Sequence, residues 1–395
     1  MGQLISADHA ALVDALCTSG AVDGDWADAF RAVPRHLFVP NAVWTGLRPP
    51  LRSVIRQDEP TEWSELVHSD VALVTQVDDG DTPAGQPGRY PTSSISQPSL
   101  VAMMLARTQL TPGHRVLEIG TGTGYNAALL AYRLGAAAVT SVEIDPALAA
   151  AARTALEKAS FGAVTVITGD GTLGHPPGAP YDRVLSTATC HLVPRAWIEQ
   201  TQPGGRIVTP WASSYHNGAL LHLDVTDDGA ASGHFNGNVS FMWLRDQRIP
   251  FGWLASQPEV TYQQTTTSAH PYRLNDVSAS FAIGLLVPGC HYQLITRNGD
   301  PYDAVMWLFD PTTSSRASVT ITPRATEFPI SQYGPRHLWD EAIAAYDWWV
   351  RVGRPDYSRF GLTVTRDGEQ HAWLDSPQHL LPALTHGDHH GQGGR

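Results

Sequence analysis

Residues 116–125 read Val-Leu-Glu-Ile-Gly-Thr-Gly-Thr-Gly-Tyr, a short apolar strand that runs into a turn with glycine at every second position. Glycines at positions 120, 122 and 124 allow the backbone to pass close to a ligand, because a Cβ atom there would collide with it. A helix is expected over residues 125–134, ended by Gly135. This strand, turn and helix together predict a ligand-binding turn of an α/β protein.

The chain on either side of this turn alternates between short apolar strands and helices. Helices are expected at 100–110, 146–159 and 194–200, and further strands at 139–143, 164–168, 182–187 and 206–208. Short apolar strands separated by helices predict a parallel sheet that is covered on both faces. Before this region we expect two short helices within residues 4–32, and a loop over residues 78–94, which are rich in Gly, Pro and Asp.

The second half of the chain has a different pattern. Strand-like runs at 281–286, 292–296, 304–309 and 317–321 are separated by turn residues. Residues 336–352 carry apolar side chains at helical spacing, and residues 360–365 and 370–374 flank Asp367-Gly368, which favours a hairpin. This half is expected to be α+β.

Composition excludes several classes of protein. Only 16% of the 395 residues are charged, the net charge is −12, and Lys158 is the single lysine, so a nucleic-acid partner is not expected. The cysteines, Cys17, Cys190 and Cys290, are scattered and form no Cys-x-x-Cys motif, which favours a reducing cytosol and neither a disulfide framework nor a metal site. No apolar run reaches the length of a membrane span. We therefore expect a cytoplasmic protein with no membrane, metal or nucleic-acid partner, and the oligomeric state stays open.

The acidic residue within the turn argues for one kind of cofactor. The spacing is G-x-G-x-G and not the dinucleotide pattern G-x-G-x-x-G. A dinucleotide places its pyrophosphate on the helix N-terminus, where Glu118 would repel it. The same carboxylate could accept a hydrogen bond from an ammonium group. S-adenosylmethionine carries an amino-acid moiety and a sulfonium cation but no phosphate, and it is therefore the expected cofactor.

Two more acidic residues end the following strands. Glu143 is placed to accept hydrogen bonds from both ribose hydroxyls, and Asp170, or the N–H of Gly171, is placed to contact the adenine edge. The alternative is an ordinary glycine turn with Glu143 and Asp170 as solvated strand ends. Three acidic residues at successive strand ends, where open α/β sheets bind ligands, favour a cofactor site.

Four blocks of sequence carry a resemblance to a known family. They are VPRHLFVP at 33–40, SISQP at 94–98, EIGTGTG at 118–124, and YDRV at 181–184 together with QPGGR at 202–206. Over residues 30–211 the chain resembles the protein-L-isoaspartate O-methyltransferase family. The resemblance implies a doubly wound, mostly parallel Rossmann-like methyltransferase sheet and methylation of an aspartyl or isoaspartyl carboxyl group.

The resemblance also implies roles for individual residues. Ser96 matches the serine treated as catalytic in the family, and Ser94 stands where the family usually has threonine. An aspartyl carboxylate has a pKa of about 3.9 and is already ionised, so the reaction needs alignment and no general base. The alternative is that these serines merely cap the following helix. The cofactor contacts expected from the motif and the resemblance together are Ser93, Ile95, Glu118, Gly120, Thr121, Gly122, Gly124, Glu143, Ile144, Asp170 and Gly171.

The chain continues far beyond the residues that match repair enzymes of the family, and its extension resembles longer homologues encoded with ribosomal peptide natural products. These methylate an ordinary aspartate, and the ester then closes to an aspartimide that persists or opens to isoaspartate. The expected domains are a methyltransferase domain with an N-terminal helical segment (1–225) and an α+β peptide-recognition domain (226–395).

Three functions therefore remain open. The leading expectation is an aspartyl O-methyltransferase of natural-product peptides. The alternatives are an isoaspartyl repair methyltransferase and a non-catalytic module that binds the cofactor or a peptide. Intact Ser94 and Ser96 argue against the last, since a pure binder has no use for an acceptor pocket.

Overall fold

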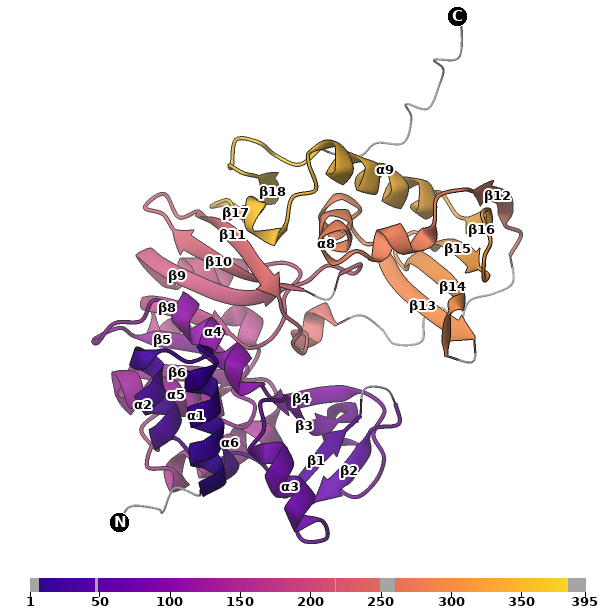
Figure 1. Cartoon of the computed structure of the whole chain (residues 1–395). Coiled ribbons are helices and arrows are strands. Elements are labelled where there is room, and N and C mark those ends of the chain that lie inside the picture. The colour runs from indigo at the N-terminus through magenta and orange to yellow at the C-terminus, as the bar shows by residue number, and fades with distance from the viewer. Residues whose placement is uncertain (1–6, 47–48, 217, 249–259, 298, 383–395) are drawn as a thin grey trace, which may run out of the picture.

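The computed structural model describes residues 7–46, 49–216, 218–248, 260–297 and 299–382, and these form three β-sheets with helices packed around them (Figure 1). Two N-terminal helices, α1 (Ala7–Thr18) and α2 (Gly24–Ala32), confirm the expected helical start. Among the described residues, no helix combines the length and the apolar character required to cross a membrane.

The first sheet is antiparallel, with strand order β2-β1-β3-β4, and was not expected. Its elements, with the helix that interrupts them, are β1 (Ala42–Thr45), β2 (Arg52–Ile55), α3 (Pro60–Val67), β3 (Leu73–Val77) and β4 (Pro91–Ile95). The expected loop over 78–94 is therefore wrong at its end, where β4 begins. The polar run Thr92-Ser93-Ser94 lacks the apolar alternation that indicates a strand, so pairing with β3 decides its conformation.

The second sheet has nine strands and contains the expected α/β unit. Its parallel strands lie in the order β9-β8-β5-β6-β7, so β5 is central and the chain winds outward in both directions. The elements are α4 (Pro98–Arg107), β5 (Val116–Ile119), α5 (Tyr125–Leu134), β6 (Val139–Glu143), α6 (Pro146–Lys158), β7 (Thr165–Thr168), β8 (Tyr181–Ser186), α7 (Arg195–Glu199) and β9 (Thr201–Trp211). This confirms the Rossmann-like, doubly wound fold.

The same sheet continues beyond β9 with four antiparallel strands. These are β10 (Ala219–Val225), β11 (Ala231–Asn238), β17 (Phe360–Val364) and β18 (Gln370–Leu374), and the last two form the expected hairpin. The division expected between residues 225 and 226 thus falls between two adjacent strands of one sheet. The chain leaves this sheet after β11, builds the third sheet, and returns at β17.

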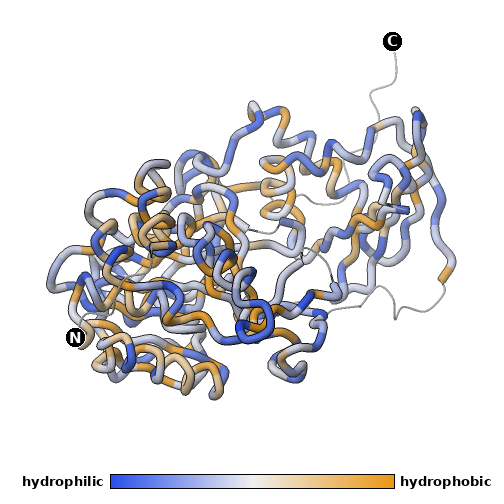
Figure 2. The backbone as a smooth tube through the Cα atoms, turned by 60° about the horizontal axis from the view of Figure 1, so that its bottom comes forward, coloured by the Kyte–Doolittle hydropathy of each residue, from blue (hydrophilic) through white to orange (hydrophobic). Residues whose placement is uncertain are grey.

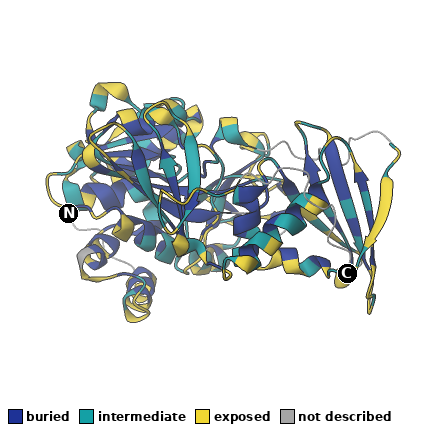
Figure 3. Ribbon diagram, turned by 90° about the horizontal axis from the view of Figure 1, so that it is seen from above, coloured by how far each residue is buried: buried dark blue, intermediate teal, exposed yellow. Residues whose placement is uncertain are grey.

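The third sheet is antiparallel, with order β12-β16-β15-β14-β13, and carries two helices. Its elements are β12 (Gln263–Thr267), α8 (Val277–Leu286), β13 (His291–Arg297), β14 (Asp300–Asp310), β15 (Ser315–Ile321), β16 (Phe328–Tyr333) and α9 (Leu338–Arg351). The expected α+β character and the helix near 336–352 are confirmed. Figure 3 shows the edge strand β12 as exposed, in contrast to the buried strands beside it.

The strand expected at 281–286 is wrong, because these residues complete helix α8. Asp276 caps that helix, and its Oδ1 accepts hydrogen bonds from the N–H groups of Ser278 and Ala279. Apolar residues cover α8 on all sides, so the run has neither helical nor strand periodicity in its sequence.

Three hydrophobic clusters form the main cores. One lies between α1, α2, α4, α5 and the central sheet, one on the opposite face of that sheet, and one between the third sheet and its helices. Figure 2 shows hydrophobic segments running through the interior of both parts of the molecule. Phe281 of α8 and Trp349 of α9 pack in the cluster of the central sheet, so these helices join the third sheet to it.

Candidate active site

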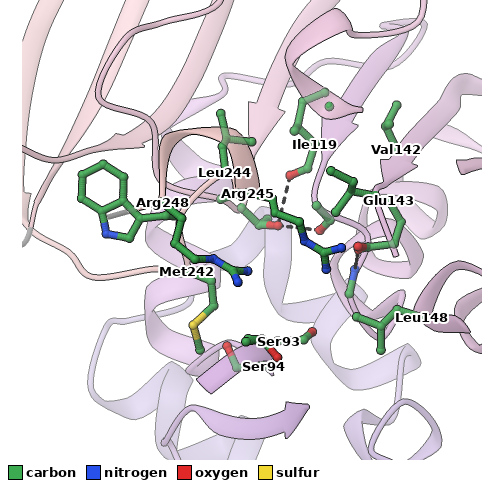
Figure 4. A pocket seen from close by; sticks show the side chains of 18 of the residues that line it. Ser93, Ser94, Ile119, Val142, Glu143, Leu148, Met242, Leu244, Arg245 and Arg248 are labelled. Atoms are coloured by element: carbon green, nitrogen blue, oxygen red, sulfur yellow. Dashed lines mark hydrogen bonds between the residues drawn. The ribbon is translucent and has the colours of Figure 1, made fainter. Parts of the chain in front are cut away.

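A pocket of about 770 Å³, partly open to solvent, lies at the carboxyl ends of β5 and β6 (Figure 4). This is the edge at which the chain winds outward from β5 in opposite directions, where open α/β sheets bind their ligands. Most of the residues expected in the site line this pocket: Ser93, Ser94, Ser96, Gly120, Gly122, Glu143, Ile144, Asp170 and Gly171.

The turn after β5 requires glycine for two reasons. Gly120 has φ +90° and Gly122 has φ +53°, in the left-handed region that side chains rarely adopt. A Cβ atom on Gly120 would also lie 2.8 Å from Oγ1 of Thr187, which itself donates a hydrogen bond to the Gly120 carbonyl at 2.6 Å. The turn therefore presents bare backbone to the pocket.

Glu143 is held at the end of β6 by two backbone amides. The N–H of Gly122 donates to Oε2 at 2.8 Å and the N–H of Asp145 donates to Oε1 at 3.1 Å. Burial is the largest influence on this carboxyl group and raises its pKa, while the two amide hydrogen bonds oppose that effect. Each carboxylate oxygen has a second lone pair, so Glu143 can still accept from hydroxyl groups of a ligand.

Asp170 and Gly171 form the wall beyond β7. Both oxygens of Asp170 accept hydrogen bonds from Thr172, one from its N–H at 2.8 Å and one from its hydroxyl at 2.7 Å. The Asp170 side chain thus shapes the turn as well as the pocket. A Cβ atom on Gly171 would lie 2.6 Å from Cγ2 of Ile119, so only glycine fits there.

Glu118 does not line the pocket, and the expected contact with an ammonium group is wrong. Its side chain is fully buried beneath the glycine turn, where Asn126 donates to Oε1 at 2.6 Å and Ser141 donates to Oε2 at 2.5 Å. Burial raises the pKa of Glu118 to about 7. Through these two hydrogen bonds the residue ties β5 to α5 and β6.

Three other expected residues lie behind the pocket wall. Oγ1 of Thr121 lies 2.6 Å from Oγ of Ser141, and Gly124 precedes α5 with φ +87°. A Cβ atom on Gly124 would lie against Ala152 and Leu156 of α6. Ile95 and Thr121 line a smaller adjoining cavity that shares Ser94 and Ser96 with the main pocket.

The serines of β4 face the glycine turn and do not cap the next helix. A Cβ atom on Gly122 would lie 3.7 Å from the Ser94 carbonyl oxygen and 3.8 Å from Oγ of Ser93. The residue that precedes α4 is Gln97, and no serine side chain bonds to the helix N-terminus there. The capping alternative therefore fails, and Ser94 and Ser96 border both cavities.

A buried arginine fixes the backbone around these serines. The guanidinium of Arg35, from the VPRHLFVP block, donates to the carbonyl oxygens of Ile95 and Ser96 at 3.4 and 3.2 Å. It also donates to the carbonyls of residues 67, 69 and 71. Burial lowers the pKa of Arg35 to about 10, so it remains a cation at neutral pH. Its block was noted for the resemblance, but nothing in the sequence indicated this contact.

The roof of the pocket comes from residues that sequence reasoning missed. Met242, Trp243, Leu244, Arg245 and Arg248 follow β11 and cover the side opposite the serines. Their only signal was the resemblance of residues 240–245 to longer homologues, because a segment so distant in the sequence has no pattern that links it to the glycine turn.

The residues present fit S-adenosylmethionine. Gly120, Gly122 and Gly171 line the pocket without side chains, and Glu143 offers acceptor oxygens at the end of β6. Ile144 and Leu148 supply apolar surface beside them. A cofactor with two hydroxyls, a flat base and no phosphate suits these groups.

The comparisons with known proteins agree with this site. The family model described as protein-L-isoaspartate (D-aspartate) O-methyltransferase matches residues 60–249. A Pyrococcus horikoshii protein-L-isoaspartate O-methyltransferase is 39% identical over 171 residues, which are 43% of this chain and 73% of the relative. A relative of the same name from Thermococcus onnurineus is 41% identical over 226 residues, 57% of this chain and 86% of the relative.

A solved structure shares the fold. The structure named protein-L-isoaspartate O-methyltransferase has a TM-score of 0.52 and 22% identity, and the match covers 93% of this chain and all of that chain. The relatives, which are matched over most of their own length, identify the chain as a member of the protein-L-isoaspartate O-methyltransferase family, an S-adenosylmethionine-dependent carboxyl O-methyltransferase.

Proposed function

We propose that the protein methylates the free carboxylate of L-isoaspartyl residues in peptides or proteins. One observation carries this proposal: Ser94 of β4 and Ser96 just after it line the same pocket as the glycine turn that follows β5. The names of the relatives support the isoaspartyl substrate over the ordinary aspartate that the sequence first suggested.

The residues must align the acceptor carboxylate with the methyl group, and they need not transfer a proton. The acceptor is a carboxylate, ionised at neutral pH, so no base has to remove a proton. S-adenosylmethionine supplies the methyl group, and a carboxylate oxygen forms the new C–O bond as the C–S bond breaks with its electron pair going to sulfur. Ser94 and Ser96 donate hydrogen bonds to the acceptor and hold it in line.

The cofactor contacts follow from the position of each residue. Glu143 accepts from the ribose hydroxyls, and Ile144 with Asp170 and Gly171 surrounds the adenine. Gly120 and Gly122 would hold the methionine part, with Ser93 beside Gly122. Glu118, Thr121 and Gly124 act indirectly, because they shape the turn from behind.

The second candidate is methylation of an ordinary aspartate in a maturing natural-product peptide, followed by aspartimide closure. The third sheet favours it. Helix α9 covers one face of this sheet. The opposite face carries the half-buried Trp307 and the buried Arg316, whose guanidinium lies over the rings of Tyr262 and Tyr333. Aromatic side chains are enriched where proteins bind peptides, so this face is the proposed peptide-recognition surface.

Matched peptides distinguish these functions. The enzyme is incubated with labelled S-adenosylmethionine and with one peptide made in an isoaspartyl, an aspartyl and an asparaginyl form. Methyl transfer to the isoaspartyl form alone supports the first proposal. Transfer to the aspartyl form, followed by loss of methanol, supports the second. If S-adenosylhomocysteine binds and no peptide of either kind is methylated, both proposals fail and the protein is a binding module.

A further inference from the structure

Two arginines reach the same pocket from its roof. Arg245 and Arg248 are the only basic side chains among the described residues that line it, and its acidic ones are Glu143 and Asp170. Figure 4 shows the Arg245 guanidinium directed toward Glu143, on the side assigned to the ribose. The Arg248 guanidinium instead points into the open part of the pocket, above Ser93 and Ser94.

The backbone that carries these arginines is fixed to the loop after β8. The N–H of Thr189 donates to the Met242 carbonyl at 2.7 Å, and the N–H of Leu244 donates to the Thr189 carbonyl at 2.9 Å. The side chain of Gln247 accepts from the N–H of His191 at 2.6 Å and donates to the Leu192 carbonyl at 2.8 Å. These bonds therefore hold the backbone next to Arg248 in a defined position at the mouth of the pocket.

One carboxylate orients both guanidinium groups. Nη1 of Arg248 lies 2.7 Å from Oδ2 of Asp79, and Nη2 of Arg245 lies 3.4 Å from Oδ1 of the same residue. Asp145, 3.7 Å from Arg245, is already bonded to Gln76 and to two N–H groups at the start of α6. Asp79 therefore holds both arginines at the pocket mouth, and Arg245 also lies within ion-pair distance of Asp145.

We infer that Arg248 binds the acceptor carboxylate of the substrate and is a specificity-determining residue of this enzyme. This inference rests on the proposed carboxyl methylation, whichever aspartyl form is the substrate. A guanidinium presents five N–H donors in a planar fork, so the hydrogen bond from Nη1 to Asp79 leaves donors for a second carboxylate. Asp79 keeps the fork in place while the substrate enters.

The role predicts a particular kinetic signature. The carboxylate loses its negative charge as the ester forms, so Arg248 attracts the acceptor no more strongly in the transition state than in the bound substrate. An interaction that is no stronger in the transition state than in the ground state changes KM and does not raise kcat. The neutral ester is no longer held by this charge, which favours product release.

The first test is the variant Arg248→Gln, with Arg195→Gln as its matched control. Arg195 lies on the exposed side of α7, paired with Glu199, away from the pocket. With the peptide that the wild type methylates, we expect Arg248→Gln to raise KM about 10- to 100-fold, the effect of one charge-assisted hydrogen bond. The kcat and the affinity for S-adenosylhomocysteine should stay within about twofold, and the control should not change.

A binding experiment separates this inference from the proposed function. An isoaspartyl peptide and its counterpart with a carboxamide in place of the free carboxylate are titrated into enzyme saturated with S-adenosylhomocysteine. Wild type should prefer the carboxylate, and Arg248→Gln should bind both equally. Equal preference in wild type and variant, or an equal loss of cofactor affinity, would overturn the role of Arg248. Failure of wild type to methylate any peptide would instead count against the proposed function.

Discussion

Ser96 lines both cavities and follows directly after β4, which faces the glycine turn. We expect Ser96→Ala to lower kcat about 10- to 100-fold, because the acceptor carboxylate is no longer held in line for its attack on the methyl group. Affinity for S-adenosylhomocysteine and the melting temperature should not change. Ser19→Ala, at the end of α1, is the control, since its hydroxyl bonds only to the local Leu16 carbonyl. Unchanged turnover would remove the role assigned to Ser96.

The raised pKa of Glu118 predicts how the free energy of unfolding changes with pH. Burial raises its pKa from 4.5 to about 7 in the folded protein, so the folded state binds more protons than the unfolded state between these values. The free energy of unfolding should therefore fall as pH rises from about 4.5 to 7, by at most about 1.4 kcal/mol per pH unit. The buried His9 and the partly buried His36, whose pKa values desolvation lowers, act with the opposite sign.

The Glu118 contribution is isolated by difference. Urea unfolding of wild type and Glu118→Gln is compared at each pH, because the histidine contributions are common to both and cancel. As pH rises toward 7, the wild type should lose unfolding free energy relative to Glu118→Gln. Glu199→Gln, on the exposed side of α7, serves as control. A difference that is independent of pH would contradict the assignment.

The turn between β5 and α5 provides a test at the level of an element. Gly120 and Gly135 have nearly the same φ, +90° and +86°, but a Cβ atom on Gly135 would meet nothing within 4 Å. Both alanine variants should lose about 1–2 kcal/mol of stability from the left-handed backbone. Only Gly120→Ala should also lose affinity for S-adenosylhomocysteine, measured by calorimetry, because its Cβ collides beside the pocket. Equal cofactor affinity in both variants would argue against this.

Elements were predictable from sequence where a local period or cap marked them. The parallel strands β5 to β9 and their helices have this pattern, and the glycine turn with Glu143 indicated the cofactor. Helix α8 was missed because it is apolar on every side, and β4 because its residues are polar. Glu118 was placed wrongly because sequence gives the position of a residue at a strand end but not the direction of its side chain.

The roof of the pocket shows a second limit of sequence reasoning. Arg35 and Arg248 reach the site from segments that are distant in the chain, through backbone carbonyls and through Asp79. Such contacts produce no regular spacing of residues from which they could be predicted. They became visible only when the folded chain placed the 241–248 segment against the loop after β8.

For the whole molecule, Phe281 is the clearest link between the third sheet and the methyltransferase sheet. Its ring packs against Phe235 of β11 at 5.0 Å and Phe360 of β17 at 5.6 Å between ring centres. We expect Phe281→Ala to lower the free energy of unfolding by about 3–5 kcal/mol, as for other large core side chains. Tyr302→Ala, 63% exposed on β14, should change it little.

The unfolding profile distinguishes a joined molecule from two independent parts. If α8 joins the sheets, thermal unfolding of wild type is one transition, and Phe281→Ala shifts it as a whole for both tryptophan fluorescence and cofactor binding. A variant in which the cofactor-binding transition stays at the wild-type temperature would show that the parts unfold separately.

The return of the chain at β17 has a consequence for any shortened form of the enzyme. Residues 239–359 leave and rejoin one sheet, so cutting the chain after β11 removes the neighbour that covers its outer side. The amides and carbonyls of Ser232 to His234 would then be available to another polypeptide, and such a fragment is prone to self-association. A shortened enzyme should therefore keep both β11 and β17 and lose only residues that lie between them.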